Sequence, residues 1–280
     1  MQQRLVGVFD SGIGGLSVAR QIKSIIPETS LVYVSDSDFA PYGDKSQPQI
    51  LERCIEISTW LKNTGVEVVV VACNTATVST INQLRKLIDV PFVGVEPGIK
   101  PAVKQSQDKN IGVLATSQTA ASCWFKGAVQ NLRQDCQIHV QACPGLAEQV
   151  ESLDLGLSEQ LVRYLDNLID KQVDQIVLGC THYSFLSSAI EQYLSSNVTL
   201  VDTGEAVAKQ LKRILNLTPK SSSMGEVLGD SVVDRFYSTG EVSHYNGQLK
   251  VLWSERGIIG QTLTLGSDAD ANSTTSPKVA

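Results

Sequence analysis

The sequence predicts an α/β protein of two similar, pseudo-symmetric lobes, each a doubly wound and mainly parallel sheet. Three observations support this fold class. Apolar runs typical of buried strands alternate with segments of helical period. Four of these runs recur in the same order about 105 to 107 residues later, as in a duplicated half. One recurring pair ends at Cys73 and Cys180, each followed by polar residues. We therefore expect one thiol per lobe and an active site in the cleft between the lobes.

The first lobe is predicted to contain strands at 5–9, 31–34, 68–71 and 92–95, and helices from Leu16, over 48–64 and over 78–88. The loop 10–15 is rich in glycine, but Ser17 stands where the dinucleotide fingerprint has its third glycine. Its amides at a helix start can either hold a carboxylate or phosphate or belong to a plain turn. The long irregular loop 35–43 is typical of a segment that covers a site.

The second lobe is predicted to repeat these strands at 111–115, 138–140, 175–179 and around Val201. Prolines and a glycine in 96–101 indicate a hinge, and a helix at 205–215 leaves the lobe. We expect residues 1–97 and about 206–260 to form one lobe and 98–205 the other. The polar segment from about 266 to 280 is predicted to be a disordered tail.

Composition limits the partners of this 280-residue chain. Its net charge of −6 gives no basic stripe, so nucleic acid is not expected as the main partner. No apolar run approaches the roughly 20 residues that a bilayer span needs, and no signal-peptide core precedes the first strand. The six cysteines include no C-x-x-C pair. We expect a cytoplasmic protein with a small-molecule partner and no membrane association.

Two thiols at equivalent strand ends allow three kinds of chemistry. A redox pair needs Cα atoms within about 7 Å, whereas opposed cleft walls would hold them further apart. A zinc site could use Cys73, Cys180 and His182, but three or four ligands are required. Inverting a stereocentre needs a base on one face of the carbon and an acid on the other, which two opposed thiols provide. In this third hypothesis Asp10 and His182 would help to form a thiolate.

Several motifs, in this order along the chain, closely resemble those of the glutamate racemase family, which interconverts L- and D-glutamate without a cofactor. They are Asp10-Ser11-Gly12-Ile13-Gly14-Gly15-Leu16, Pro41-Tyr42-Gly43, Ala72-Cys73-Asn74-Thr75-Ala76, Cys143-Pro144, Gly179-Cys180-Thr181-His182-Tyr183 and Phe236-Tyr237-Ser238-Thr239-Gly240. The resemblance covers about residues 5–255. It implies that Cys73 takes the proton from D-glutamate and Cys180 from L-glutamate. It also implies that Asp10 lies beside Cys73, and that His182 and Glu151, or Glu148 in its place, lie beside Cys180.

The same resemblance implies a set of substrate contacts, no cofactor, no metal, and a role in supplying D-glutamate for peptidoglycan and thus for cell shape. The contacts are Asp10, Ser11, Tyr42, Gly43, Asn74, Thr75, Thr116, Thr181 and His182. The oligomeric state stays open, with a homodimer as one option. Two alternatives remain: an aspartate racemase of the same two-thiol type, which would need a basic or differently placed polar group for its shorter substrate, and a non-catalytic two-lobed carboxylate-binding protein.

Overall fold

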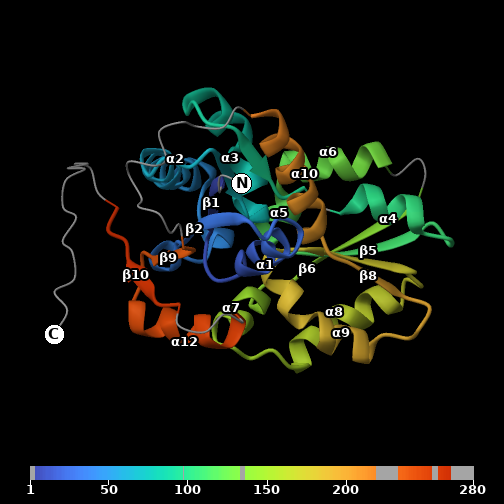
Figure 1. Cartoon of the computed structure of the whole chain (residues 1–280). Coiled ribbons are helices and arrows are strands. Elements are labelled where there is room, and N and C mark those ends of the chain that lie inside the picture. Colours follow the sequence, from blue (N-terminus) through green and yellow to red (C-terminus); the bar gives the residue numbers. More distant parts are fainter. Residues whose placement is uncertain (1–3, 97, 133–135, 219–232, 254–257, 266–280) are drawn as a thin grey trace.

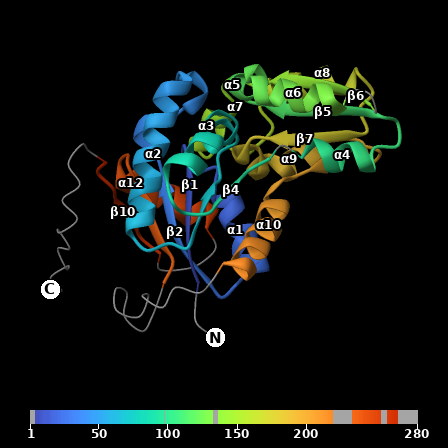
Figure 2. The same ribbon diagram turned by 90° about the horizontal axis from the view of Figure 1, so that it is seen from above.

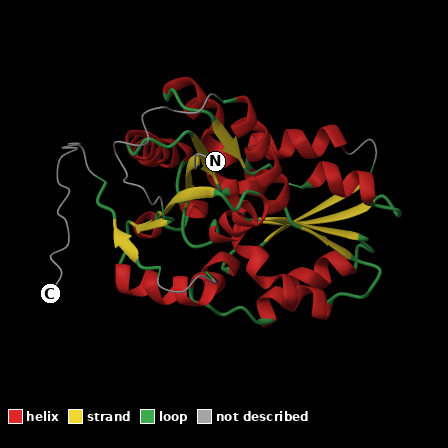
Figure 3. Cartoon of the chain, viewed as in Figure 1, coloured by secondary structure: helices red, strands yellow, loops and turns green. Residues whose placement is uncertain are grey.

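The computed structural model describes residues 4–96, 98–132, 136–218, 233–253 and 258–265, which form two lobes (Figure 1). Each lobe is built on one sheet with helices on both of its faces (Figure 3). No helix in these ranges is both long enough and apolar enough to cross a bilayer. The expected tail at about 266–280 lies outside the described residues.

Both sheets are parallel throughout, and the smaller one repeats part of the larger. The larger has the order β10-β9-β2-β1-β3-β4, with strands β1 Arg4–Asp10, β2 Thr29–Ser35, β3 Val68–Val71, β4 Phe92–Gly94, β9 Arg235–Ser238 and β10 Gly260–Thr262. The smaller has the order β6-β5-β7-β8, with strands β5 Asn110–Ala115, β6 Gln137–Ala142, β7 Gln175–Gly179 and β8 Thr199–Val201. The order β2-β1-β3-β4 thus recurs as β6-β5-β7-β8, and the predicted fold class is confirmed. The lobe boundaries remain a prediction.

Helices cover both faces of each sheet, and the central strands β1, β2, β3, β5 and β7 are buried almost throughout. On the larger sheet one face packs on α1 Leu16–Ile25, α10 Gly204–Leu217 and α12 Val242–Leu252, and the other on α2 Gln47–Asn63 and α3 Asn74–Leu87. On the smaller sheet one face packs on α4 Ile99–Gln105 and α6 Cys123–Leu132, and the other on α8 Glu159–Ile169 and α9 Ser187–Tyr193. Helix α10 lies alongside α1 (Figure 2) and so links the end of the second lobe to the first.

Strand β1 shows why the central strands carry apolar residues in succession. Val6 and Val8 belong to the cluster under α1, whereas Leu5 and Phe9 belong to the cluster under α2. Side chains alternate between the two faces of a strand, so a strand that is covered on both sides needs apolar residues in succession.

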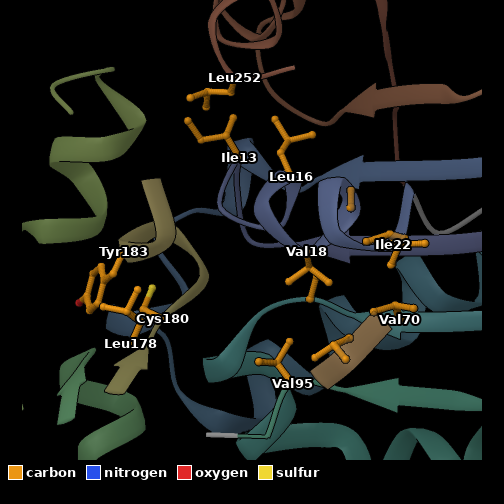
Figure 4. Packing of buried hydrophobic residues seen from close by; sticks show 14 of the residues in the cluster. Ile13, Leu16, Val18, Ile22, Val70, Val95, Leu178, Cys180, Tyr183 and Leu252 are labelled. Atoms are coloured by element: carbon orange, nitrogen blue, oxygen red, sulfur yellow. The ribbon is translucent and has the colours of Figure 1, made fainter. Parts of the chain in front are cut away.

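One hydrophobic cluster continues from one lobe into the other. It contains Val70 of β3 and Leu178 of β7, which belong to different sheets. Figure 4 shows part of it, with Cys180 beside Leu178 and Tyr183. The two lobes therefore share one packed hydrophobic cluster.

Two details of the sequence prediction were wrong. The helix expected over 78–88 begins four residues earlier, because the Cys73 thiol accepts a hydrogen bond from the Ala76 amide (3.4 Å) and caps α3. The polar residues after Cys73, which interrupted the apolar pattern, form its first turn. Strands β9 and β10 were not predicted, since they are only four and three residues long and lie at the edge of the sheet.

Strand β9 offers a test of how much the returning C-terminal segment contributes to stability. Phe236 is buried, with ring centroids 5.9 Å from Tyr33 and 5.0 Å from Trp253. Phe236→Ala should lower the free energy of unfolding by about 3–5 kcal/mol because it leaves a cavity between these rings. Denaturant unfolding followed by tryptophan fluorescence measures the change. A loss below about 1 kcal/mol would show that this segment packs loosely.

Candidate active site

Cys73 and Cys180 face the same cavity, of about 440 Å³, at the carboxyl ends of the strands. Cys73 directly follows the loop after β3, and Cys180 directly follows β7, so each lobe supplies one thiol. Their exposed fractions are only 5% and 6%, and both are free thiols. The other predicted site residues that line the cavity are Ser11, Tyr42, Gly43, Asn74, Thr75, Thr116, Glu151 and His182. Asp10 and Thr181 are buried behind this wall.

Asp10 reaches Cys73 through Ser11. The Cys73 thiol donates a hydrogen bond to Ser11 Oγ (3.6 Å), and the Ser11 hydroxyl donates to Asp10 Oδ1 (3.4 Å). Burial, and then the charge of Asp10, raise the pKa of Cys73 to about 12. Burial also raises the pKa of Asp10 from 3.8 to about 6, against the opposing effect of His182. Cys73 is therefore a protonated thiol near neutral pH, with a carboxyl group of intermediate acidity behind it.

Cys180 has a histidine as its direct partner. His182 Nδ1 lies 3.7 Å from the Cys180 sulfur, and its Nε2 lies 2.7 Å from Glu151 Oε1. Burial alone would lower the pKa of His182, but the hydrogen bonds and charges of Cys180 and Glu151 raise it well above its ordinary value. Burial alone would raise the pKa of Glu151. The hydrogen bond and charge of His182 outweigh this effect, so the pKa of Glu151 lies below its ordinary value. Glu148 also lines the cavity, from an exposed position, but Glu151 is the residue that contacts His182.

The glycine loop binds the protein's own carboxylates. The Gly12 amide donates to Asp10 Oδ1 (2.9 Å), and the Ile13 amide donates to Glu151 Oε1 (2.9 Å). The sequence left a carboxylate or phosphate cradle and a plain turn open. The Ile13 amide holds a carboxylate, although it is one of the protein's own, and the Gly12 amide closes a turn onto Asp10. Thr181 of the second lobe donates to Asp10 Oδ2 (3.0 Å), so the bonds cross the cleft in both directions.

Glycine at position 14 is explained by the same contact between lobes. A Cβ built there would lie 2.7 Å from Thr181 Oγ1 and even nearer to the His182 ring. The second lobe packs against bare backbone at this point, so any side chain would push the lobes apart.

Neutral polar groups form the rest of the wall. Both amide atoms of Asn74 are buried without a hydrogen-bond partner among the described residues, which is costly unless a ligand supplies one. Thr75 and Thr116 come from different lobes, and their hydroxyls lie 3.0 Å apart. Of the described residues that line the cavity, none is lysine or arginine.

Tyr42 lines the cavity while its hydroxyl points to a buried carboxylate. It donates to Asp36 Oδ2 (2.7 Å), and Arg53 and Thr239 donate to the same carboxylate. Asp36 therefore fixes the loop that carries Tyr42 and Gly43. It also gives Thr239, from the last of the sequence motifs, a structural role.

Three residues that support the site were not among the predicted ones. Besides Asp36, they are Thr119, whose hydroxyl bonds Thr75 and Thr116, and Gln248, which bonds Glu151. Gln248 could have been noticed from the sequence, because it is a polar residue within an apolar stripe at helical spacing. The residues around Thr119 show no pattern that marks it as a site residue.

The arrangement suits proton transfer better than the other two hypotheses. Within the described residues there is no group of three or more His, Cys, Asp or Glu side chains placed to bind a metal ion. The cavity instead presents a neutral thiol from one lobe and a thiol paired with a histidine from the other. A proton taken on one side of a bound carbon could be replaced from the other.

Comparisons with known proteins agree along almost the whole chain. A sequence model of the Asp/Glu/Hydantoin racemase family matches residues 16–211. The chain is 41% identical over 256 residues to a glutamate racemase of Ralstonia pickettii, covering 90% of this chain and 89% of that protein. It is 37% identical over 265 residues to one of Pseudomonas aeruginosa, covering 93% and 98%. The crystal structure of Escherichia coli glutamate racemase with L-glutamate and an activator superposes with a TM-score of 0.82 at 30% identity, covering 93% and 98%.

The burial of Asp10 predicts a measurable pH dependence of stability. Its pKa is about 6 in the folded protein and near 3.8 otherwise, so the folded state binds the extra proton between these values. Compared with Asp10→Asn, the wild type should therefore gain about 2 kcal/mol of unfolding free energy as the pH falls from 7 to 4. Denaturant unfolding of both proteins across this range measures the difference. A difference that stays constant would mean that Asp10 is ionised as easily in the fold as in water.

Proposed function

The chain belongs to the Asp/Glu/Hydantoin racemase family, and we propose on that premise that it interconverts L- and D-glutamate by proton transfer at Cα. The observation that carries the proposal is the pair of buried thiols, one from each lobe, in a single cavity. The substrate is assigned from the relatives at 37–41% identity, which are glutamate racemases, and from the E. coli enzyme that binds L-glutamate.

In the L to D direction Cys180 acts as the base. Its proton passes to His182, and the resulting imidazolium is stabilised by the Glu151 carboxylate 2.7 Å away. The thiolate removes the Cα proton from one face, and the Cys73 thiol, protonated because of its raised pKa, supplies a proton to the other face. One C–H bond breaks and one forms, so the reaction needs no oxidant and no cofactor.

In the D to L direction the roles are exchanged. Cys73 must first lose its proton, and the path on its side runs through the Ser11 hydroxyl to Asp10. Asp10 has a pKa of about 6, so at neutral pH it is mostly ionised and can accept a hydrogen-bonded proton. Cys73 thus exchanges its proton by way of Ser11 and Asp10, whereas Cys180 relies on His182 and Glu151.

The polar wall supports glutamate over aspartate. A shorter dicarboxylate would need a basic or differently placed polar group, and the described lining residues include no lysine or arginine to serve as the basic one. Asn74, Thr75 and Thr116 offer neutral donors for carboxylate oxygens, with Tyr42 and Gly43 on the neighbouring loop. Thr181 instead donates to Asp10, so we assign it to the support of that carboxylate.

The cellular role follows from the proposed product. We assign the enzyme to the supply of D-glutamate for peptidoglycan, and so to cell-wall formation and cell shape. Six free thiols agree with a reduced, cytoplasmic setting. A homodimer is compatible with this role, and sedimentation analysis would decide it.

The direct test incubates the protein with L-glutamate in deuterated water, with a chelator and without pyridoxal phosphate. Circular dichroism should decay toward zero while Cα becomes deuterated. Cys73→Ala and Cys180→Ala should each lower the rate by several orders of magnitude, because two groups that act as a unit are both needed. L-aspartate serves as the competing substrate. A steady signal without exchange in the wild type would leave a binding protein as the better description.

Primary isotope effects on kcat/KM should show which residues assist Cys73 and which assist Cys180. Enantiomers have equal free energy, so every variant keeps the same kcat/KM in both directions. Asp10→Asn should raise mainly the barrier at Cys73, and α-deuterated D-glutamate should then show a larger primary isotope effect on kcat/KM than α-deuterated L-glutamate. His182→Asn and Glu151→Gln should give the reverse order. The same effect for both enantiomers in all three variants would assign these residues to binding or folding.

A further inference from the structure

Helix α12 brings a buried amide to the back of Glu151. Gln248 Nε2 donates to the Glu151 backbone carbonyl (2.7 Å) and lies 3.2 Å from its Oε2. Its exposed fraction is 1%, and it does not line the cavity. A residue almost 100 positions away in the sequence is therefore in contact with the carboxylate that holds His182.

An amide at this place is unusual for the helix that carries it. Tyr245, Leu249 and Leu252 are its buried neighbours at helical spacing, and all three belong to the hydrophobic core. An amide buried among apolar groups is costly unless it is hydrogen-bonded. Gln248 Nε2 finds its partner in Glu151, at the last residue of α7 Leu146–Glu151, where the carbonyl has no acceptor role within the helix. Its Oε1 is buried without a hydrogen-bond partner among the described residues.

The two oxygens of Glu151 have separate partners. Oε1 accepts from the Ile13 amide (2.9 Å) and lies 2.7 Å from His182, while Oε2 lies against Gln248. With both oxygens engaged, the carboxylate cannot rotate away from the imidazole. Without Gln248, Oε2 would lose its donor, and only the two bonds at Oε1 would fix the carboxylate plane.

We propose that Gln248 is a positioning residue for the Cys180 half of the reaction, acting through Glu151 and His182. This inference rests on the proposed function. Gln248 touches neither substrate nor thiol. It fixes the acceptor that keeps the His182 ring oriented toward Cys180, and it leaves the Cys73 side, with Ser11 and Asp10, unaffected.

The test uses Gln248→Met, which keeps the length of the side chain and removes its donor. The rate should fall about ten- to a hundredfold, as when a hydrogen-bond partner of an active histidine is removed. The isotope effect on kcat/KM should become larger for α-deuterated L-glutamate than for the D enantiomer. The acid limb of the pH–rate profile should also move to higher pH, because the bond from Gln248 is one of the effects that lower the pKa of Glu151.

Asn246→Ala is the matched control on the same helix. The side-chain oxygen Oδ1 of Asn246 accepts a hydrogen bond from the Gly260 amide (2.7 Å), so this variant loosens the C-terminal segment without touching Glu151. It should lower thermal stability and leave the order of isotope effects and the pH profile as in the wild type. If Gln248→Met does not fold, Gln248→Asn replaces it, because the shorter amide no longer reaches Oε2.

The outcomes separate this inference from the proposed function. Racemisation by the wild type with unchanged isotope order and pH profile in the Gln248 variant would make Gln248 a structural tie and overturn the inference alone. No racemisation by the wild type would overturn the proposed function first. The same isotope pattern in Asn246→Ala would also count against a specific role for Gln248.

Discussion

Hydrogen bonds across the cleft hold two carboxylates in place, those of the buried Asp10 and of the partly buried Glu151, and the geometry of both thiols depends on them. The Ile13 amide of the first lobe binds Glu151 of the second, and Thr181 of the second binds Asp10 of the first. A buried carboxylate without donors would be costly or would take up a proton. Each lobe therefore completes the other's acid–base group, and Gly14 allows the close approach that this requires.

The sequence predicted the fold class because its signals are long and repeated. Apolar runs such as 68–71 and 175–179 can hardly form anything except covered strands, and their recurrence indicated the duplication. The short strands β9 and β10 were missed because three or four residues carry too little pattern, and Arg235 and Ser238 of β9 are polar. The early start of α3 was missed because a thiol, which is a weak acceptor, caps it at Cys73.

Site residues that are marked by their type and their spacing along the chain could be predicted from the sequence. Residues whose role depends on side-chain contacts between distant segments could not. Cys73 and Cys180 follow equivalent strands of the two sheets, so their convergence was expected from two similar lobes that face each other. Ser11 as the link between Cys73 and Asp10 depends on side-chain geometry that no spacing reveals. The same is true of Gln248, which packs on Glu151 only because the chain returns to the first lobe.

The duplicated halves match in backbone and differ in chemistry. Phe9 pairs with Val71 as Leu114 pairs with Leu178, so Ala115 is the counterpart of Asp10. The second lobe has no carboxylate there, and Cys180 depends on His182 instead.

The use of two thiols leaves the proposed enzyme, after each turnover, in a protonation state that depends on which enantiomer it converted last. After L-glutamate has been converted, Cys180 holds the proton it removed and Cys73 has given its own away. That empty form is ready for D-glutamate, and two protons must be exchanged with water before it can accept L-glutamate again. Cys73 can regain one by way of Ser11 and Asp10, and Cys180 can release one by way of His182. At high substrate concentration this recovery, and not the chemistry at Cα, sets an upper limit on the net rate in one direction.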